Sequence, residues 1–319
     1  MSEVGVELSN TEGAPPLTLM GRVRDNDLLA SFLSSKLAVA AGAVTLLFFL
    51  AALLAPLLAP TDPFDPAKNF LIDSLNPPRF AAGGDPRFLL GTDDQGRDLW
   101  SAILYGLRVS LLIGMLGVLL GGAIGITLGL IAGYAGGRID SIIMRIADVQ
   151  LTFPAILIAL LVDGVVQALL KGQDREQAAF GILVISIGLS FWVQYARTVR
   201  GSTLVEKNRD YVQAARLIGL SPTRILVRHI LPNVMGPVLV IATINLALAI
   251  ITEATLSFLG VGLPPTQPSL GTLIRIGQNF LFSGEWWIVT FPSITLAALV
   301  LAVNLLGDWL RDALNPRLK

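Results

Sequence analysis

Residues 208–237 read NRDYVQAARLIGLSPTRILVRHILPNVMGP, a polar interruption between two long apolar runs. Asp210 at a helix N-cap and Gln213 three residues later predict a helix start, because each can bond a backbone N–H group that the first turn leaves free. Gly219 supplies the left-handed conformation with which many helices end. The stretch therefore predicts a helix of about eight residues, about 12 Å long.

One face of this short helix carries four residues at three- and four-residue spacing: Tyr211, Ala214, Ala215 and Ile218. A helix of about two turns is marginal in water, so we expect packing to hold it in place. After it, Ser221 and Pro222 predict a second helix start as cap and first helical residue, and Pro232 predicts a kink in the segment that follows.

The whole chain has the composition of a protein that crosses a membrane several times. Of its 319 residues, 53% are hydrophobic and 14% are charged, whereas a soluble domain carries about 25% charged residues. The absence of cysteine and the single histidine, His229, exclude disulfides and thiolate or multi-histidine metal sites. No G-x-x-x-x-G-K-[ST] loop occurs, so we expect neither ATP hydrolysis nor a cofactor in this chain.

Six apolar segments predict an all-α polytopic protein with six transmembrane helices, at residues 37–59, 109–132, 139–162, 178–198, 234–258 and 288–309. Residues 1–36 are then a cytoplasmic N-terminal tail, and residues 60–105 an extracytoplasmic segment. Residues 106–319 form the core, which holds five of the helices and a cytoplasmic loop at 201–232. This organisation places both termini in the cytoplasm.

The basic residues support this orientation. Under the predicted topology, 15 of the 23 Lys and Arg residues lie in the cytoplasm and 8 lie outside, the bias expected of cytoplasmic loops. They are densest between residues 197 and 228. Aromatic residues do not alternate with them as single-stranded nucleic-acid binding requires, so we expect the lipid bilayer, and no nucleic acid, as a partner.

The second predicted span contains glycine at every fourth position: Gly117, Gly121, Gly125, Gly129 and Gly133. In lipid there is little hydrophobic drive between helices, so close backbone approach over such glycines is how spans associate. The ladder predicts that this helix is buried in the bundle. The alternative is that it lines the pathway of a solute.

Among the polar residues inside the predicted spans, four are candidates for a solute pathway or for structural pairing: Arg145, Asp148, Asn245 and Glu253. Arg145 and Asp148 are three residues apart near the inner boundary, so we expect them to neutralise each other, and we expect Pro154 to kink their helix. Glu253 has two interpretations, because an ionisable residue within a span is a functional candidate. It pairs with a neighbouring helix or with an outer-loop residue such as Arg275, or it lies on the path of a peptide amino terminus.

Three stretches carry a resemblance to a known family, the third being residues 257–260 with the proline-rich loop at 264–268. The 208–237 stretch contains Q-A-A, three residues, G, nine residues, H, one residue and L-P, which resembles the EAA loop of the ABC importer permeases in its spacing throughout. Two letters depart from that loop, since Gln213 stands where Glu is usual and His229 where Ile is usual. Gln keeps the cap and loses the charge, so the resemblance implies a docking helix without a salt bridge from residue 213.

The second stretch is LLGTDDQGRDLW at residues 89–100, which is similar to the segment before the second span in the dipeptide, oligopeptide and nickel branch of this family. Gly91 and Gly96 allow tight turns, Asp93 or Asp94 can bond its own backbone, and residues 97–105 predict a helix along the membrane surface. Two roles stay open for the segment, a cover over the helix ends or a contact for a binding protein.

The resemblance spans about residues 85–319 and implies the type I ABC importer permease fold. In that family the short helix fits a groove of the ATP-hydrolysing subunit. Transferred to this chain, the resemblance assigns ATPase coupling to Asp210, Tyr211, Gln213, Ala214, Ala215 and Gly219, with Leu231 and Pro232 joining them to the fifth span. It implies a location in the inner (plasma) membrane of the cell. It also implies a second, homologous permease subunit, two cytoplasmic subunits that bind ATP and Mg, and an extracytoplasmic substrate-binding protein.

The implied solute is a short peptide, a dipeptide or an oligopeptide. Nickel, haem and glutathione are the alternatives within the same class. A proton-coupled secondary carrier that works through Asp148 or Glu253 is the alternative from another class, and it predicts uptake without any ATPase partner.

Overall fold

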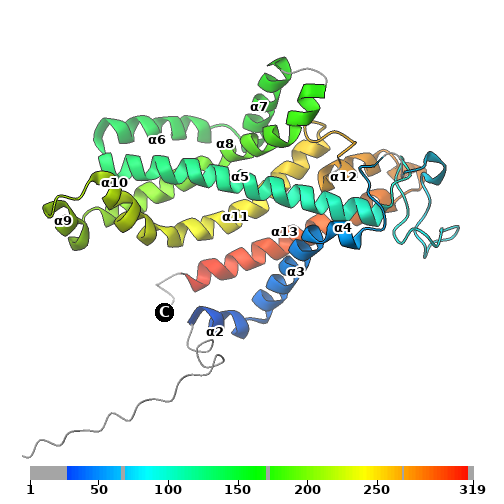
Figure 1. The fold of residues 1–319 in the computed structure, drawn as a ribbon, viewed down its shortest axis with the longest axis horizontal. Coiled ribbons are helices and arrows are strands. Elements are labelled where there is room, and N and C mark those ends of the chain that lie inside the picture. The colour runs from blue at the N-terminus through cyan, green and yellow to red at the C-terminus, as the bar shows by residue number, and fades with distance from the viewer. Residues whose placement is uncertain (1–26, 66–68, 170–172, 268, 315–319) are drawn as a thin grey trace, which may run out of the picture.

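The computed structural model describes residues 27–65, 69–169, 173–267 and 269–314, and it is helical over most of this length (Figure 1). Residues 1–26 of the predicted tail, which spans residues 1–36, lie outside the described residues. The elements are α2 (Asp27–Ser34), α3 (Lys36–Leu53), α4 (Ala55–Leu58), η1 (Leu71–Asp73), α5 (Leu99–Ala135), α6 (Gly137–Leu151), α7 (Ala155–Leu169), α8 (Gln173–Glu206), α9 (Asp210–Leu217), α10 (Pro222–Ile225), the π-helical η2 (Leu226–Ile230), α11 (Leu231–Phe258), α12 (Leu270–Gln278), η3 (Leu281–Ser283) and α13 (Trp287–Ala313).

Within the described residues, five helices are long and apolar enough to cross a membrane: Lys36–Leu53, Leu99–Ala135, Ala178–Glu206, Pro222–Phe258 and Trp287–Ala313. A sixth is present if α6 and α7 together count as one span, although they meet at 95°. The predicted all-α polytopic fold is confirmed, and the predicted number of six spans is reached if α6 and α7 count as one. The break confirms the predicted kink, because α7 starts directly after Pro154, whose ring cannot continue the preceding helix.

The first span is shorter than predicted. α3 ends at Leu53 instead of residue 59, and the short α4 follows with Pro56 in its first turn. Pro56 has no N–H group to donate to the carbonyl of Ala52, so the regular hydrogen bonding of the helix is interrupted here.

The prediction of a separate surface helix at residues 97–105 is wrong, because these residues lead into a long helix. The Asp98 side chain accepts a hydrogen bond from the backbone N–H of Ser101 at 2.9 Å and caps a helix that begins at Leu99. This helix, α5, continues without a break to Ala135 over 37 residues. At about 1.5 Å per residue it is about 55 Å long, more than about 30 Å of hydrocarbon requires, so it extends beyond the bilayer.

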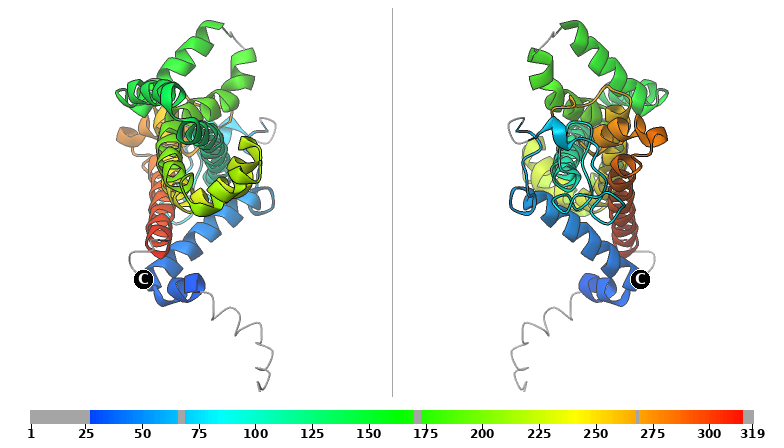
Figure 2. Two further views of the ribbon diagram at one scale, coloured as in Figure 1. Left: turned by 90° about the vertical axis from the view of Figure 1, so that its left-hand side faces the viewer. Right: turned by 90° about the vertical axis from the view of Figure 1, so that its right-hand side faces the viewer.

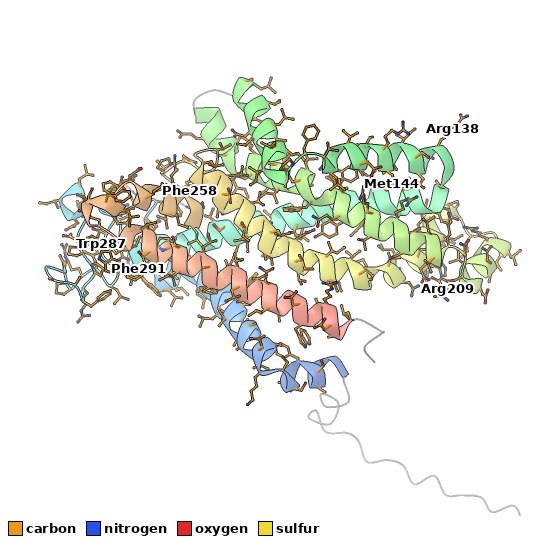
Figure 3. All side chains as sticks on the ribbon, turned by 180° about the vertical axis from the view of Figure 1, so that it is seen from behind. Arg138, Met144, Arg209, Phe258, Trp287 and Phe291 are labelled. Carbon is orange, nitrogen blue, oxygen red and sulfur yellow. The ribbon has the colours of Figure 1, made fainter. Side chains whose placement is uncertain are left out.

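The long helices lie side by side around α5, which has its most extensive contact with α8 and also packs on α11 (Figure 1). Views along the bundle show α5 near the middle, with α3 and α13 to one side and α6, α7 and α8 to the other (Figure 2). We call the end of the bundle that carries α9 the α9 end, and the opposite end, with α12, the α12 end. Figure 3 shows Arg209 at the α9 end and Trp287 at the α12 end.

The glycine ladder of α5 lies in its contact with α8. Its five members are all buried: Gly117, Gly121, Gly125, Gly129 and Gly133. A Cβ atom at Gly125 would lie 2.3 Å from the carbonyl oxygen of Trp192, and one at Gly129 would lie 2.6 Å from that of Ala196. A Cβ atom at each of the other three would also meet α8 within 3.0 Å. These separations are too short for any side chain, so the two helices depend on glycine for their close approach.

Candidate functional site

The start of α9 differs from the predicted cap by one residue. The N-cap is Arg209, whose carbonyl accepts from the N–H groups of Val212 and Gln213 at 3.0 and 3.1 Å. Asp210 is therefore the first helical residue and not the cap, and the side chain of Gln213 donates to the carbonyl of Lys207 at 3.4 Å. The predicted reciprocal cap is wrong, although an acidic residue in the first turn still favours the positive end of the helix dipole.

The end of α9 follows the prediction. Gly219 has φ +78°, the left-handed conformation. The N–H of Leu220 donates to the carbonyl of Ala215 at 3.1 Å, and the N–H of Gly219 donates to that of Arg216 at 3.0 Å. This pair of bonds is a Schellman motif, and it limits α9 to the expected eight residues.

The face of α9 that packs on the protein is not the one predicted. Val212 and Ala215 are buried, and both belong to a core cluster that includes Ile225 and Ile230. The other members of the expected face, Tyr211, Ala214 and Ile218, are exposed. Val212 was not predicted to lie in the packed face, because the residues that cover it come from α10 and η2. The one signal in the sequence is that Val212 lies three residues before Ala215 and so shares its side of the helix.

The outer side of α9 presents apolar side chains that contact little of this chain. Leu217 is 89% exposed and Ile218 is 75% exposed. They stand at the C-terminal end of α9, which lies at one tip of the molecule (Figure 1). This exposed pair of large aliphatic residues outside the long apolar helices is a candidate contact surface.

Tyr211 connects α9 to two long helices. Its hydroxyl donates to the carboxylate of Glu206 at the end of α8 and accepts from the Nδ2 atom of Asn233 in α11 at 3.2 Å. Partial burial and the Glu206 carboxylate raise the pKa of Tyr211 to about 12, so the hydroxyl stays a donor at neutral pH. Tyr211 thus links α9 to both α8 and α11 through hydrogen bonds of one side chain.

Leu231 and Pro232 begin α11 directly after η2. The N–H of Leu231 donates to the carbonyl of Leu226, five residues back, as in a π-helix. A regular α-helix would press the ring of Pro232 against the carbonyl of Arg228, and the wider turn gives it room. The predicted kink therefore takes the form of a π turn, and residues Pro222–Phe258 run as one span.

The basic residues at the α9 end tie helices together. Lys207 Nζ donates to the carbonyl of Gly133 at 2.8 Å, linking α8 to α5. The Arg200 guanidinium pairs with Asp140 of α6, with Nη2 2.6 Å from Oδ2. Arg216 of α9 lies over the ring of Tyr134, 5.1 Å from its centre. The first two contacts join the end of α8 to α5 and α6, and the third holds α9 against the end of α5.

The expected pair of Arg145 and Asp148 is wrong. Asp148 forms its ion pair with Arg197 of α8, and no ion pair of Arg145 occurs among the described residues. Spacing along one helix predicts only local partners, whereas α8 runs alongside α6 and offers a guanidinium to Asp148. Both side chains of the pair are about half exposed, so it contributes little to stability.

Glu253 is fully buried inside the bundle. Its two carboxylate oxygens accept hydrogen bonds from the hydroxyls of Ser110 in α5 and Ser257 in α11, each at 2.7 Å. The expectation of a neighbouring helix is confirmed, and the suggested partner Arg275 is wrong. Asn245, two turns below, is also fully buried, and its side-chain amide has no hydrogen-bond partner among the described residues.

The 89–100 segment forms a compact set of turns at the α12 end and leads into α5. Gly91 and Gly96 have φ of +83° and +73°, which confirms the predicted turns. The Oδ1 atom of Asp93 accepts from the N–H groups of Gln95 and Arg97, which confirms the predicted bond to its own backbone. Trp287 of α13 donates its indole N–H to the carbonyl of Thr92 at 3.1 Å, so the segment covers the end of α13.

A buried ion pair lies in this segment, and its arginine also binds the loop after α11. Arg97 is 1% exposed, and its Nε atom lies 2.6 Å from Oδ2 of Asp93, which is fully buried. The Nη1 atom of Arg97 donates to the carbonyl of Pro265 at 2.7 Å. This bond joins residues 168 positions apart, which no pattern in the sequence predicts.

Asp93→Asn is expected to destabilise the folded protein by about 3–5 kcal/mol, because it leaves the buried Arg97 guanidinium uncompensated. Asp94→Asn is the matched control. Burial, and secondarily the charge of Asp93, raises the pKa of Asp94 above its ordinary value of 3.8, so its ionised form opposes folding once the pH exceeds that value. Asp94→Asn should therefore keep or raise the thermal midpoint at pH 7. Equal losses in both variants would contradict the assignment.

Comparisons with known proteins agree with this architecture. Residues 125–319 match the family described as binding-protein-dependent transport system inner membrane component, and residues 26–78 match the N-terminal TM domain of oligopeptide transport permease C. The chain is 39% identical to the di/tripeptide transport system permease protein DppC of Pseudomonas aeruginosa over 91% of each chain. It is 42% identical to the dipeptide transport system permease protein DppC of Escherichia coli K12 over 81% of this chain and 82% of that one.

Among solved structures, two inward-facing forms of the MetNI methionine ABC transporter are similar at 18% and 20% identity, with TM-scores of 0.48 and 0.49. They cover 67% and 68% of this chain, and 94% and 96% of their own chains. The family match alone covers more than half of the chain. The protein therefore belongs to the binding-protein-dependent transport system inner membrane components, the multi-pass permease subunits of ABC importers.

Proposed function

We propose that this permease conducts short peptides, dipeptides or oligopeptides, into the cell. The proposal is supported by the similarity to the permeases of Pseudomonas aeruginosa and Escherichia coli, whose names state di/tripeptide and dipeptide transport. Nickel, haem and glutathione stay as alternative solutes. The chain itself is non-catalytic in this scheme, and partner subunits bind ATP and Mg.

We further propose that α9 is the contact for a cytoplasmic ATP-binding subunit. The observation that carries this step is the exposure of Leu217 and Ile218 on a helix that is fixed at its other face by Val212 and Ala215. An apolar tip on a rigid support suits a groove in a partner. The proposed coupling residues keep their roles: Asp210, Tyr211, Gln213, Ala214, Ala215 and Gly219 form the docking helix, and Leu231 and Pro232 join it to α11.

The working cycle needs two permease subunits around one pathway, two ATP-binding subunits and one extracytoplasmic binding protein. Closure of the ATP-bound pair draws the two docking helices together. Through Tyr211 this movement reaches α8 and α11. ATP shifts the equilibrium because it binds the closed pair more tightly than the open one. The α9 end and both termini face the cytoplasm, in agreement with the basic residues gathered there.

Reconstitution into liposomes tests the proposal. The complete complex should take up a labelled dipeptide when ATP and the loaded binding protein are present. This chain with its partner permease alone should show no uptake under a proton gradient. Gradient-driven uptake without ATP-binding subunits would favour the secondary carrier, and competition by nickel, haem or glutathione instead of dipeptide would reassign the solute.

A further inference from the structure

A cavity of about 400 Å³ opens at the α12 end, between the α7–α8 pair and the loop that follows α11. Its walls come from four elements that are far apart in sequence. Asp163 belongs to α7, Glu176 to α8, and Arg275 to α12, while residues 260–265 form the floor. Its volume lies within the range of small-molecule sites.

The charges of this cavity are divided between its walls. Arg275 stands on the α12 side, and the carboxylates of Asp163 and Glu176 stand on the α7–α8 side. Asp163 is 5% exposed and already interacts within the protein. Glu176 is exposed. The cavity therefore has a cationic wall and an anionic wall. Such an arrangement matches a molecule that carries one negative and one positive end.

Arg275 has hydrogen-bonding capacity that the described part of the chain leaves unused. Its Nε atom is buried and has no hydrogen-bond partner among the described residues. Gly260, at φ +84°, makes room for the guanidinium, because a Cβ atom there would lie 3.2 Å from Nη1. A buried donor without a partner is costly, and a carboxylate is the acceptor that matches a guanidinium best.

We propose that this cavity is a receiving site for the solute on the permease itself. Arg275 binds the carboxylate end of a short zwitterionic peptide, and Glu176 accepts its ammonium end. The inference rests on the proposed function, because it takes the solute to be a peptide with free termini. The cavity lies at the end of the bundle where an imported solute enters.

The test compares peptides that lack one charge. Uptake of Ala-Ala, its C-terminal amide and its N-acetyl form is measured with the complete complex, its binding protein and ATP in liposomes. The binding protein discriminates among these peptides on its own, but it is the same in every preparation, so its preference cancels when a variant is compared with the wild type.

We call the ratio of the KM of a modified peptide to the KM of Ala-Ala the penalty for that modification. Arg275→Gln is expected to raise the KM for Ala-Ala about tenfold, the loss of one charge-assisted contact. It should reduce the penalty for amidation by the same factor. Glu176→Gln should reduce the penalty for N-acetylation and leave that for amidation unchanged. Arg275→Lys, which keeps the charge, should be intermediate. Arg79→Gln, an exposed arginine outside the cavity, should change nothing.

An amidation penalty in Arg275→Gln equal to that of the wild type would overturn this inference and leave the proposed function intact. The inference is also overturned if Arg275→Lys and Arg79→Gln behave like Arg275→Gln. If the wild-type complex takes up no dipeptide with ATP, the proposed function fails first, and this inference fails with it.

Discussion

Leu217→Asp is expected to abolish the stimulation of ATP hydrolysis by the loaded binding protein while the permease still inserts and assembles with its partner permease. Leu217 is 89% exposed, so its replacement removes almost no packing within this chain. In a docked complex the same side chain enters an apolar groove, where losing the leucine costs about 1.5–3 kcal/mol and burying an unpaired carboxylate costs more. Together these terms predict a loss of at least about tenfold in stimulated ATPase activity.

Leu217→Met is the control for this prediction, because methionine keeps the apolar surface and nearly the same volume. Val212→Asp provides the contrast. Its side chain is fully buried beneath α9, so an aspartate there should displace the helix and lower the yield of the permease as well as its coupling. Wild-type stimulation in Leu217→Asp would show that the outer side of α9 does not carry the contact.

Gly125→Ala is expected to loosen the packing of α5 on α8 and to weaken assembly of the transporter, so that less complex is purified and the purified complex is less stable. The added methyl group would lie 2.3 Å from the carbonyl oxygen of Trp192 and 2.5 Å from Cβ of Tyr195. Neither neighbour is the free end of a flexible side chain, so the two helices must separate along their length. Overpacking of this kind typically costs about 1–3 kcal/mol and occasionally more.

Gly181→Ala separates this packing effect from the effect of helix propensity. Gly181 lies in α8 with nothing within 4 Å of its would-be Cβ atom, and alanine favours a helix over glycine by about 1 kcal/mol. The thermal midpoint of the purified complex should therefore rise or stay the same in Gly181→Ala and fall in Gly125→Ala. Equal midpoints would remove the glycine ladder as the basis of the α5–α8 contact.

Local patterns predicted several features that depend on local chemistry, although the local cap of Asp210 and Gln213 was wrong. Gly219 ends α9 because only its own backbone and the preceding turn are involved. Pro154 breaks its helix for the same reason, although the 95° angle depends on how α7 and α8 pack together. The turns at Gly91 and Gly96 also need no distant partner.

Features that depend on a neighbour from elsewhere in the chain were predicted wrongly or missed. Asp148 has a local candidate in Arg145, yet it pairs with Arg197 because α8 lies beside α6. Glu253 meets Ser110, 143 positions away, and nothing in the spacing of a lone serine identifies its partner. The buried face of α9 was misassigned for the same reason, since it is chosen by the residues of α10 and η2 beneath it.

The claim that α9 contacts an ATP-binding subunit is tested most directly by cross-linking. The chain contains no cysteine, so Leu217→Cys introduces a unique thiol to which a benzophenone maleimide can be attached. Ile72→Cys, 92% exposed in η1 towards the α12 end, is the matched control. After irradiation of the assembled transporter, we expect the probe at residue 217, and not that at residue 72, to label an ATP-binding subunit. Labelling of the binding protein from residue 217, or of an ATP-binding subunit from residue 72 alone, would contradict a docking contact at α9.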